Sequence, residues 1–119
     1  MNVKLFDSEL KVMNVLWNGG DLPAKEIVKI LKEEIGWSKT TTYTIIKKCI
    51  EKGAIERKEN FICHALITQE EARDFETEML INKMYNGSSD LLIASLLGRK
   101  KLDLKKVEKL KKLVEVLED

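Results

Sequence analysis

Residues 36–50 contain the stretch that decides the fold: Gly36-Trp37-Ser38-Lys39-Thr40-Thr41-Thr42-Tyr43-Thr44-Ile45-Ile46-Lys47-Lys48-Cys49-Ile50. The pattern predicts a helix of about three to four turns that begins after Ser38, a residue type that caps helix N-termini. One face has the three-and-four spacing of a buried side, and it consists of Thr42, Ile45, Ile46, Cys49 and Ile50. The opposite face consists of Thr40, Tyr43, Thr44 and Lys47, with Thr41 and Lys48 at its edge.

The second face of this helix carries no carboxylate. No acidic residue occurs between Glu34 and Glu51, although the chain has 20 Asp and Glu against 21 Lys and Arg. Hydroxyls, a tyrosine and lysines can hydrogen-bond to bases and attract phosphates, and nothing on this face would repel them. The face is therefore typical of a helix that enters a DNA groove. It is also compatible with an ordinary surface helix, because a polar stripe opposite an apolar one is common.

The segments before this stretch predict two further helices. Asp7 before Ser8 is an N-cap signal, and Gly19-Gly20 should end the helix that follows. Leu22 would form a short extended link, and Pro23 suits the first turn of a second helix. A helix, a short turn and a second helix match the helix-turn-helix, whose second helix lies in the major groove. The acid-free helix is the second of this pair.

The segments after the stretch predict a β-hairpin. The helix should end at Lys52-Gly53, and residues 54–58 and 61–67 have the apolar content of strands joined by a turn at Glu59-Asn60. Three helices followed by a hairpin form the winged-helix variant of the helix-turn-helix. Arg57 and Lys58 would lie near the hairpin tip, where they could contact phosphates or simply be solvated.

The remaining residues predict three helices that need a partner. Thr68-Gln69-Glu70-Glu71 is a capping box at the start of a long helix. An apolar helix after Ser88 or Ser89 and an amphipathic last helix follow. A two-fold dimer would cover them, and packing back onto the front domain is the alternative. The expected dimer contacts are Phe75, Met79, Leu92, Leu96, Leu110, Leu113 and Leu117.

These elements define the expected fold class and domains. The fold class is mainly α, an α+β winged helix-turn-helix followed by a C-terminal three-helix dimerisation region. We expect a winged-helix DNA-binding domain over residues 1–68 and a helical dimerisation region over residues 69–119.

Composition and charge limit the classes of function. No run of about eighteen apolar residues occurs, so neither membrane insertion nor a secretory signal is expected. The two cysteines have no paired spacing, which favours reduced thiols in a cytoplasmic protein. The net charge of +1 argues weakly against nucleic acid. Its distribution is more informative, at +2 for residues 1–68, −4 for residues 69–98 and +3 for residues 99–119.

Catalysis and metal binding have little support in the sequence. There is a single histidine, no nucleophile near a suitable base and no glycine-rich phosphate loop, so we expect neither an enzyme nor a cofactor. Cys63 and His64 are adjacent in an expected strand and would point to opposite faces, which argues against a metal site. Cys49 is expected to be a core residue.

The order of these signals resembles the penicillinase-repressor family (BlaI/MecI type) of winged-helix transcriptional regulators. The matching pieces include Val15-Leu16-Trp17, Ala24-x-Glu26-Ile27, Trp37-Ser38, Thr41-x-x-Thr44, Lys52-Gly53-Ala54 and Tyr85-Asn86-Gly87-Ser88. The resemblance covers essentially the whole chain. It implies a cytoplasmic homodimer that represses transcription by binding a palindromic operator in double-stranded DNA.

Individual residues keep or leave the family pattern. Thr41 and Thr44 match the family's recognition-helix threonines, and Lys48 keeps a cation where a basic residue is usual. Lys39 replaces a proline, whereas Thr40 and Tyr43 occupy places where a lysine and an arginine are common. We therefore expect an operator sequence that differs from the familiar one.

The family's release mechanisms are less well matched. Antibiotic-responsive members are cleaved at an Asn-Phe bond after a sensor protease is triggered, and Ser95-Leu96 lies at that place here. A copper-responsive branch carries a C-terminal cysteine cluster, whereas residues 64–119 of this chain contain no cysteine. A sensor protease is thus a partner implied by the resemblance alone.

The sequence as a whole predicts a homodimeric repressor that binds operator DNA through a recognition helix over residues 39–52 and a basic hairpin wing. The alternative is a winged-helix module that contacts only proteins, which would not need to exclude carboxylates from the helix. The expected DNA-binding residues are Lys39, Thr40, Thr41, Tyr43, Thr44, Lys47, Lys48, Arg57 and Lys58.

Overall fold

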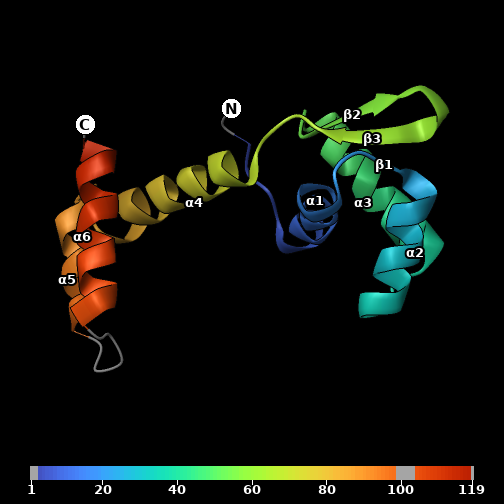
Figure 1. Cartoon of the computed structure of the whole chain (residues 1–119). Coiled ribbons are helices and arrows are strands. Elements are labelled where there is room, and N and C mark those ends of the chain that lie inside the picture. Colours follow the sequence, from blue (N-terminus) through green and yellow to red (C-terminus); the bar gives the residue numbers. More distant parts are fainter. Residues whose placement is uncertain (1–2, 99–103, 119) are drawn as a thin grey trace. The chain divides into compact units, whose positions relative to one another are not determined.

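The computed structural model describes residues 3–98 and 104–118 and divides into two compact units, residues 1–76 and 77–119. The first unit contains α1 (Asp7–Gly19), β1 (Leu22–Pro23), α2 (Ala24–Ile35), α3 (Lys39–Glu51), β2 (Ile55–Lys58), the 3-10 turn η1 (Glu59–Phe61) and β3 (Ile62–Ala65). Helix α4 (Gln69–Met84) begins in the first unit and ends in the second, which also contains α5 (Ser89–Leu97) and α6 (Leu104–Glu118) (Figure 1). The expected fold class, mainly helical with a small sheet, is confirmed.

The sheet has three antiparallel strands in the order β1-β3-β2. The expected hairpin is present, with Arg57 of β2 opposite Cys63 of β3. On the other edge of β3, Leu22 pairs with Cys63. The expectation that Pro23 lies inside the second helix is wrong, because Pro23 is extended and precedes the first residue of α2. An edge strand tolerates proline, which has no amide hydrogen to donate.

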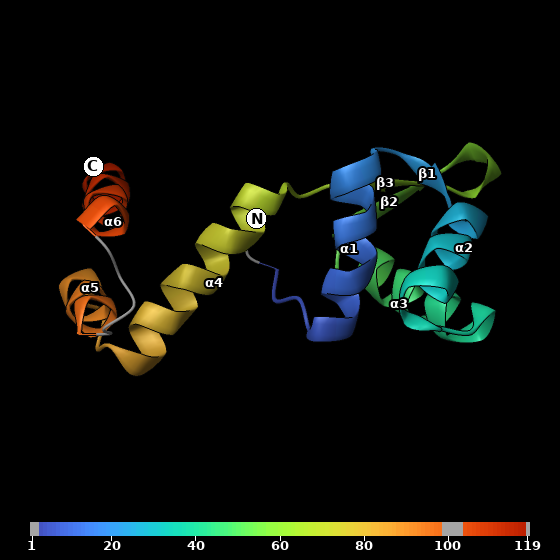
Figure 2. The same cartoon turned by 60° about the horizontal axis from the view of Figure 1, so that its bottom comes forward.

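Helices α1, α2 and α3 pack together with the sheet along one side of the group (Figure 2). Their shared core includes Val12, Met13, Ile27, Leu31, Ile46, Ile55 and Ile67, each at most 2% exposed. Cys49 and Cys63 are fully buried in it, as expected for Cys49. Burial raises the pKa of the Cys49 thiol to about 12 and that of Cys63 to about 11, so both are held as neutral thiols at neutral pH.

Local signals set most of the helix ends. Ser38 caps α3 by accepting a hydrogen bond from the Thr41 amide at 3.1 Å, and Lys52-Gly53 ends the helix as expected. The expected start of α1 is one residue late, because Phe6 rather than Asp7 occupies the N-cap position. The Phe6 amide donates to Glu9 Oε1 at 2.7 Å. The start of α1 is therefore held by a glutamate at the third helical position, which accepts from the N-cap amide, and not by an aspartate cap.

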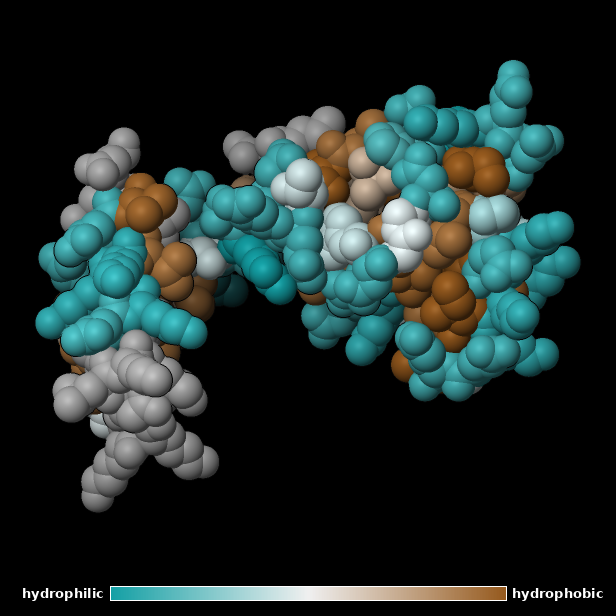
Figure 3. Space-filling view, viewed as in Figure 1, coloured by the Kyte–Doolittle hydropathy of each residue, from teal (hydrophilic) through white to brown (hydrophobic). Residues whose placement is uncertain are grey.

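The second unit exposes much of its apolar surface. Thr68 and Ser88 cap α4 and α5 by accepting hydrogen bonds from the amides of Glu71 and Leu91. Hydrophobic residues reach the surface of this unit between polar ones (Figure 3), and the most exposed include Met84, Leu91, Leu97, Leu113 and Val116.

The expected dimer contacts fall into three groups. Phe75, Met79, Leu92 and Leu96 are half-buried within the chain, and Leu113 is exposed. The side chains of Leu110 and Leu117 lie outside the residues whose side chains are described.

Candidate nucleic-acid interface

Helix α3 presents one polar face to solvent. Its buried side consists of Thr42, Ile45, Ile46 and Cys49, as expected, with Ile50 half-buried. On the outer side, a depression of about 550 Å³ is lined by five of the expected DNA-binding residues, namely Lys39, Thr40, Tyr43, Thr44 and Lys47. The structure thus brings most of the candidate residues together on one surface. Thr41 and Lys48 are exposed beside them.

The hydroxyl groups on this face are ordered by local hydrogen bonds. Thr44 Oγ1 donates to the Thr40 carbonyl at 2.9 Å. Ser38 Oγ donates to Thr41 Oγ1 at the same distance. A hydroxyl that donates within the helix keeps lone pairs that can accept a hydrogen bond from outside it. Thr44 is therefore prepared to accept, for example from the amino group of a base.

Tyr43 differs from its neighbours because it is half-buried. From the sequence it was placed only on the outer face of the helix, whereas the structure gives it a packing partner in the wing. The ring of Phe61, at the wing turn, lies 5.7 Å from the Tyr43 ring between centroids, at an interplanar angle of 54°. Such tilted pairs are favourable aromatic contacts. Lys39 Nζ also lies 5.9 Å from the Tyr43 ring centroid.

The two wing cations have different surroundings. The guanidinium carbon of Arg57 lies 4.0 Å from the Phe61 ring centroid, a cation–π distance. Lys58 Nζ instead lies 3.8 Å from Asp21 Oδ2, and Asp21 Oδ1 is 2.7 Å from His64 Nδ1. The hydrogen bond with His64, aided by the charges of His64 and Lys58, holds the pKa of the Asp21 carboxyl below its ordinary value. Arg57 therefore packs on an aromatic ring of the wing turn, whereas the charge of Lys58 is partly offset by the Asp21 carboxylate.

A groove joins the wing to α3. It has a volume of about 420 Å³ and is lined by Tyr43, Lys47, Ile50, Glu51, Arg57 and Phe61. Tyr43 and Lys47 also line the depression on the outer face of α3, so the two hollows share these two side chains. Phe61 was assigned only to a strand from the sequence. Nothing in its local pattern predicts a contact with a residue of the preceding helix.

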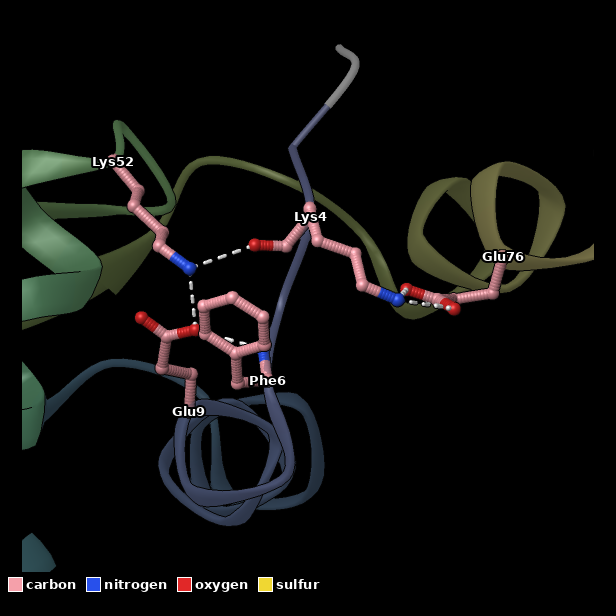
Figure 4. A network of polar contacts seen from close by, with 5 residues as sticks. All are labelled: Lys4, Phe6, Glu9, Lys52 and Glu76. Carbon is pink, nitrogen blue, oxygen red and sulfur yellow. Dashed lines mark hydrogen bonds and ion pairs between the residues drawn. The ribbon is translucent and has the colours of Figure 1, made fainter. Parts of the chain in front are cut away.

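The C-terminal end of α3 is fixed by a charge network around the buried Glu9 (Figure 4). Glu9 is 1% exposed, and its Oε1 accepts a hydrogen bond from Lys52 Nζ at 2.6 Å. Lys52 Nζ also donates to the Lys4 carbonyl at 2.8 Å and lies 4.2 Å from the Phe6 ring centroid. Lys4 in turn pairs with Glu76 at 3.1 Å. Lys52 therefore anchors α3 to α1 and to the segment before it, and its ammonium group is engaged within the protein.

Other kinds of site find no support in residues 3–98 and 104–118. No group of three or more His, Cys, Asp or Glu in these residues could hold a metal ion. Within the same residues, no helix is long and apolar enough to cross a membrane.

Comparison with known proteins gives consistent results. The family model described as penicillinase repressor matches residues 5–116. The penicillinase repressor of Bacillus licheniformis is 24% identical over 115 residues, covering 94% of this chain and 90% of that protein. The methicillin resistance regulatory protein MecI of Staphylococcus aureus (strain N315) is 25% identical over 114 residues, covering 93% of each.

Two solved structures are also similar. The solution structure of the DNA-binding domain of the repressor BlaI gives a TM-score of 0.54 at 30% identity, covering 60% of this chain and 90% of that one. The Bacillus licheniformis BlaI monomeric form in complex with the blaP half-operator gives a TM-score of 0.51 at 26% identity, with the same coverage.

Proposed function

This chain belongs to the penicillinase repressor family, and we propose that it represses transcription as a homodimer that binds a two-fold operator through α3 and the wing. The family consists of DNA-binding transcriptional repressors, and its curated members align with nearly the whole chain. Enzymatic activity is not part of that family role. The resemblance stated from the sequence is confirmed at the level of the family.

The observation that carries the proposal is the acid-free outer face of α3. Lys39, Lys47 and Lys48 are exposed together with the hydroxyls of this face, and the acidic residues nearest in sequence are Glu34, in α2, and Glu51, the last residue of α3. Such a face attracts the phosphate backbone along its length. A module that contacts only proteins has no reason to keep carboxylates away. The similar BlaI structure, which is a complex with a half-operator, also supports DNA binding by this domain.

We assign the contacts by side-chain chemistry. Thr40, Tyr43 and Thr44 would face base edges, where hydroxyls and an aromatic edge can discriminate between base pairs. The cations would contact phosphates, together with the Thr41 hydroxyl. These cations are Lys39, Lys47, Lys48, Arg57 and Lys58. Lys58 would contribute less than Arg57, because Asp21 already offsets part of its charge.

The exposed apolar side chains of the C-terminal helices support a homodimer. We propose that residues 69–119 associate with the same residues of a second copy, and that residues 1–68 form the DNA-binding domain. A two-fold dimer would place its two α3 helices in successive major grooves, with half-sites one helical turn of DNA or a multiple apart. The place of action would be the cytoplasm, where bacterial operators lie.

A sensor protease is a further proposed partner. Ser95 and Leu96, in α5, occupy the place of the Asn-Phe bond of antibiotic-responsive relatives. A protease that releases this repressor would therefore need a different bond specificity or a different cleavage position.

Selection from random duplex DNA with the full-length protein tests the proposal. We expect enrichment of a palindrome at low salt and a steep loss of affinity as salt increases. Replacing Thr44 by alanine should reduce discrimination between sequences, whereas Lys47→Ala should weaken all duplexes about equally and make the salt dependence shallower. Lys32→Ala, on the exposed side of α2, is the matched control. Enrichment of no palindrome would refute the repressor assignment in favour of a protein-binding module.

A further inference from the structure

The wing turn contains two consecutive non-glycine residues with left-handed backbone. Asn60 has φ 60° and ψ 28°, and Phe61 has φ 51°. Asparagine adopts this conformation fairly often, but a bulky residue such as phenylalanine rarely does. Strained backbone of this kind persists only where surrounding contacts favour it, and it is concentrated at functional sites. The contacts of Phe61 should therefore explain why the turn is built this way.

Those contacts join three elements. The Phe61 ring centroid lies 4.0 Å from the guanidinium carbon of Arg57 in β2 and 5.7 Å from the ring centroid of Tyr43 in α3. Lys39 lies beyond Tyr43, with Nζ 5.9 Å from the ring. Arg57, Phe61, Tyr43 and Lys39 thus form a cation–aromatic row from the wing to the start of α3. Three of these residues are candidate DNA contacts, and Phe61 contacts two of them, Arg57 and Tyr43.

We infer that Phe61 is a positioning residue for DNA recognition, which holds Tyr43 of α3 and Arg57 of the wing in one rigid unit. The inference rests on the proposed function. Tyr43 packs against the edge of the core, but Phe61 is its only aromatic contact among the described residues. Without Phe61, its ring would lose the contact on the wing side and could move toward the space left there. Arg57 would likewise lose the ring face on which its guanidinium stacks. Phe61 would act on base discrimination through these two side chains.

A purely structural role makes a different prediction. If Phe61 only packed the wing against the domain, its removal would lower stability or weaken binding to every duplex by the same factor. A positioning role changes the preference for particular base pairs, because a displaced Tyr43 no longer meets the correct base edge. The relevant base pairs are those whose selection changes in the Tyr43→Ala variant.

The decisive variant is Phe61→Gly in the full-length protein. Glycine removes the ring and also relieves the left-handed backbone, so the thermal midpoint should stay within roughly 5 °C of the wild type. Discrimination between the selected operator and one altered at the Tyr43-dependent base pairs should fall by roughly tenfold. Phe61→Tyr keeps the ring and should therefore retain the discrimination of the wild type. Asn60→Gly relieves the left-handed backbone at the neighbouring position and changes none of the four side chains of the row. It should therefore leave discrimination unchanged.

Two further measurements keep the test decisive. Phe61→Leu keeps an apolar side chain without a ring, so it should also lose discrimination even if the glycine variant fails to fold. In a Tyr43→Ala background, Phe61→Leu should have at most about a twofold further effect on the Tyr43-dependent base pairs, since coupled residues are not additive.

The outcomes separate the two hypotheses. If the wild-type protein enriches no palindrome, the proposed function fails. If it does, and the ring-deleted variants keep the wild-type discrimination or weaken all duplexes equally, the positioning role of Phe61 is overturned while the proposed function stands.

Discussion

The two units of this chain differ in how far they bury their apolar side chains. In residues 3–76, side chains such as Met13, Ile27 and Ile46 are completely buried. Among the residues of the second unit whose exposure is described, none is buried, although α5 is the most apolar helix of the chain. The first unit therefore has the core of an independent domain. The second exposes the apolar side chains from which we propose the homodimer, since such exposed apolar patches mark interaction sites.

The same difference extends to charge. The first unit buries a carboxylate, that of Glu9, and pairs it with Lys52. The second unit has charged residues at its surface, and no ion pair occurs among those of its residues whose side chains are described. A buried charge is costly unless its partner is held beside it, so the first unit must keep Glu9 and Lys52 together when it folds. We therefore expect the stability of the first unit to be independent of protein concentration, whereas that of the second should increase with association.

The largest expected difference in unfolding free energy comes from making the same leucine-to-alanine substitution in each unit. Leu31 is 2% exposed in α2, and Leu91 is 50% exposed in α5. Leu31→Ala should lower the free energy of unfolding by about 3 to 4 kcal/mol, because it leaves a cavity in the core. In dilute solution, Leu91→Ala should change it by less than about 1 kcal/mol. Urea denaturation measures both, and equal losses would contradict the contrast between the units.

The buried ion pair gives the next largest effect. Lys52→Met should cost about 2 to 3 kcal/mol of unfolding free energy, because Glu9 would remain buried without its partner. The expected cost is at the low end for a buried pair, since the Lys52 side chain is 29% exposed. Lys48→Met, on the outer face of α3, is the control and should change stability by less than about 0.5 kcal/mol. A silent Lys52 variant would mean that water solvates Glu9.

A charge in the second unit should act on association rather than folding. Leu113 is 59% exposed, so Leu113→Asp should leave the unfolding of the first unit unchanged. It should raise the dissociation constant of the dimer at least tenfold, or about 1.4 kcal/mol. Sedimentation over a range of concentrations measures this, with Lys112→Glu as an exposed control. A wild-type protein that stays monomeric at micromolar concentration would refute the homodimer itself.

The smallest effect concerns the thiols of the first unit. Burial raises the pKa of Cys49 to about 12, whereas an unfolded thiol titrates near 8.5. A raised folded pKa gives stability that is complete below the unfolded pKa and is lost as pH rises toward the folded one. Between pH 8 and 9 the Cys49 thiol should therefore remove about 0.7 kcal/mol of stability. The difference between wild type and Cys49→Val in urea, at both pH values, isolates this contribution.

Signals within a few residues of each other were sufficient for much of the fold. Ser38 capping α3, Gly53 ending it and the turn near Asn60 are all local choices of backbone conformation, and each was predicted. The division of α3 into a buried and an outer face was also predicted, because helical periodicity fixes which side chains share a face.

Contacts between distant residues could not be predicted in this way. The pairs Tyr43–Phe61, Lys52–Glu9 and Lys58–Asp21 each join separate elements. Their formation depends on how the helices and the wing pack against each other, and patterns in the sequence do not determine that packing. For the same reason, the packing of Tyr43 against the wing could not be predicted. Lys52 was expected only to mark the end of a helix, yet it occupies the centre of a buried network.

The separation between the two sides of α3 has a consequence for evolution. The residues that hold the helix in place, such as Ile46 and Lys52, are distinct from Thr40 and Thr44 on the outer face. Substitutions at the two threonines can therefore accumulate at little cost to folding, and a lineage could acquire a new operator by single steps. Tyr43 is the exception, because it contacts the wing as well as the outer surface. Change at this position should require a matching change at Phe61, so the two should vary together among descendants of this repressor.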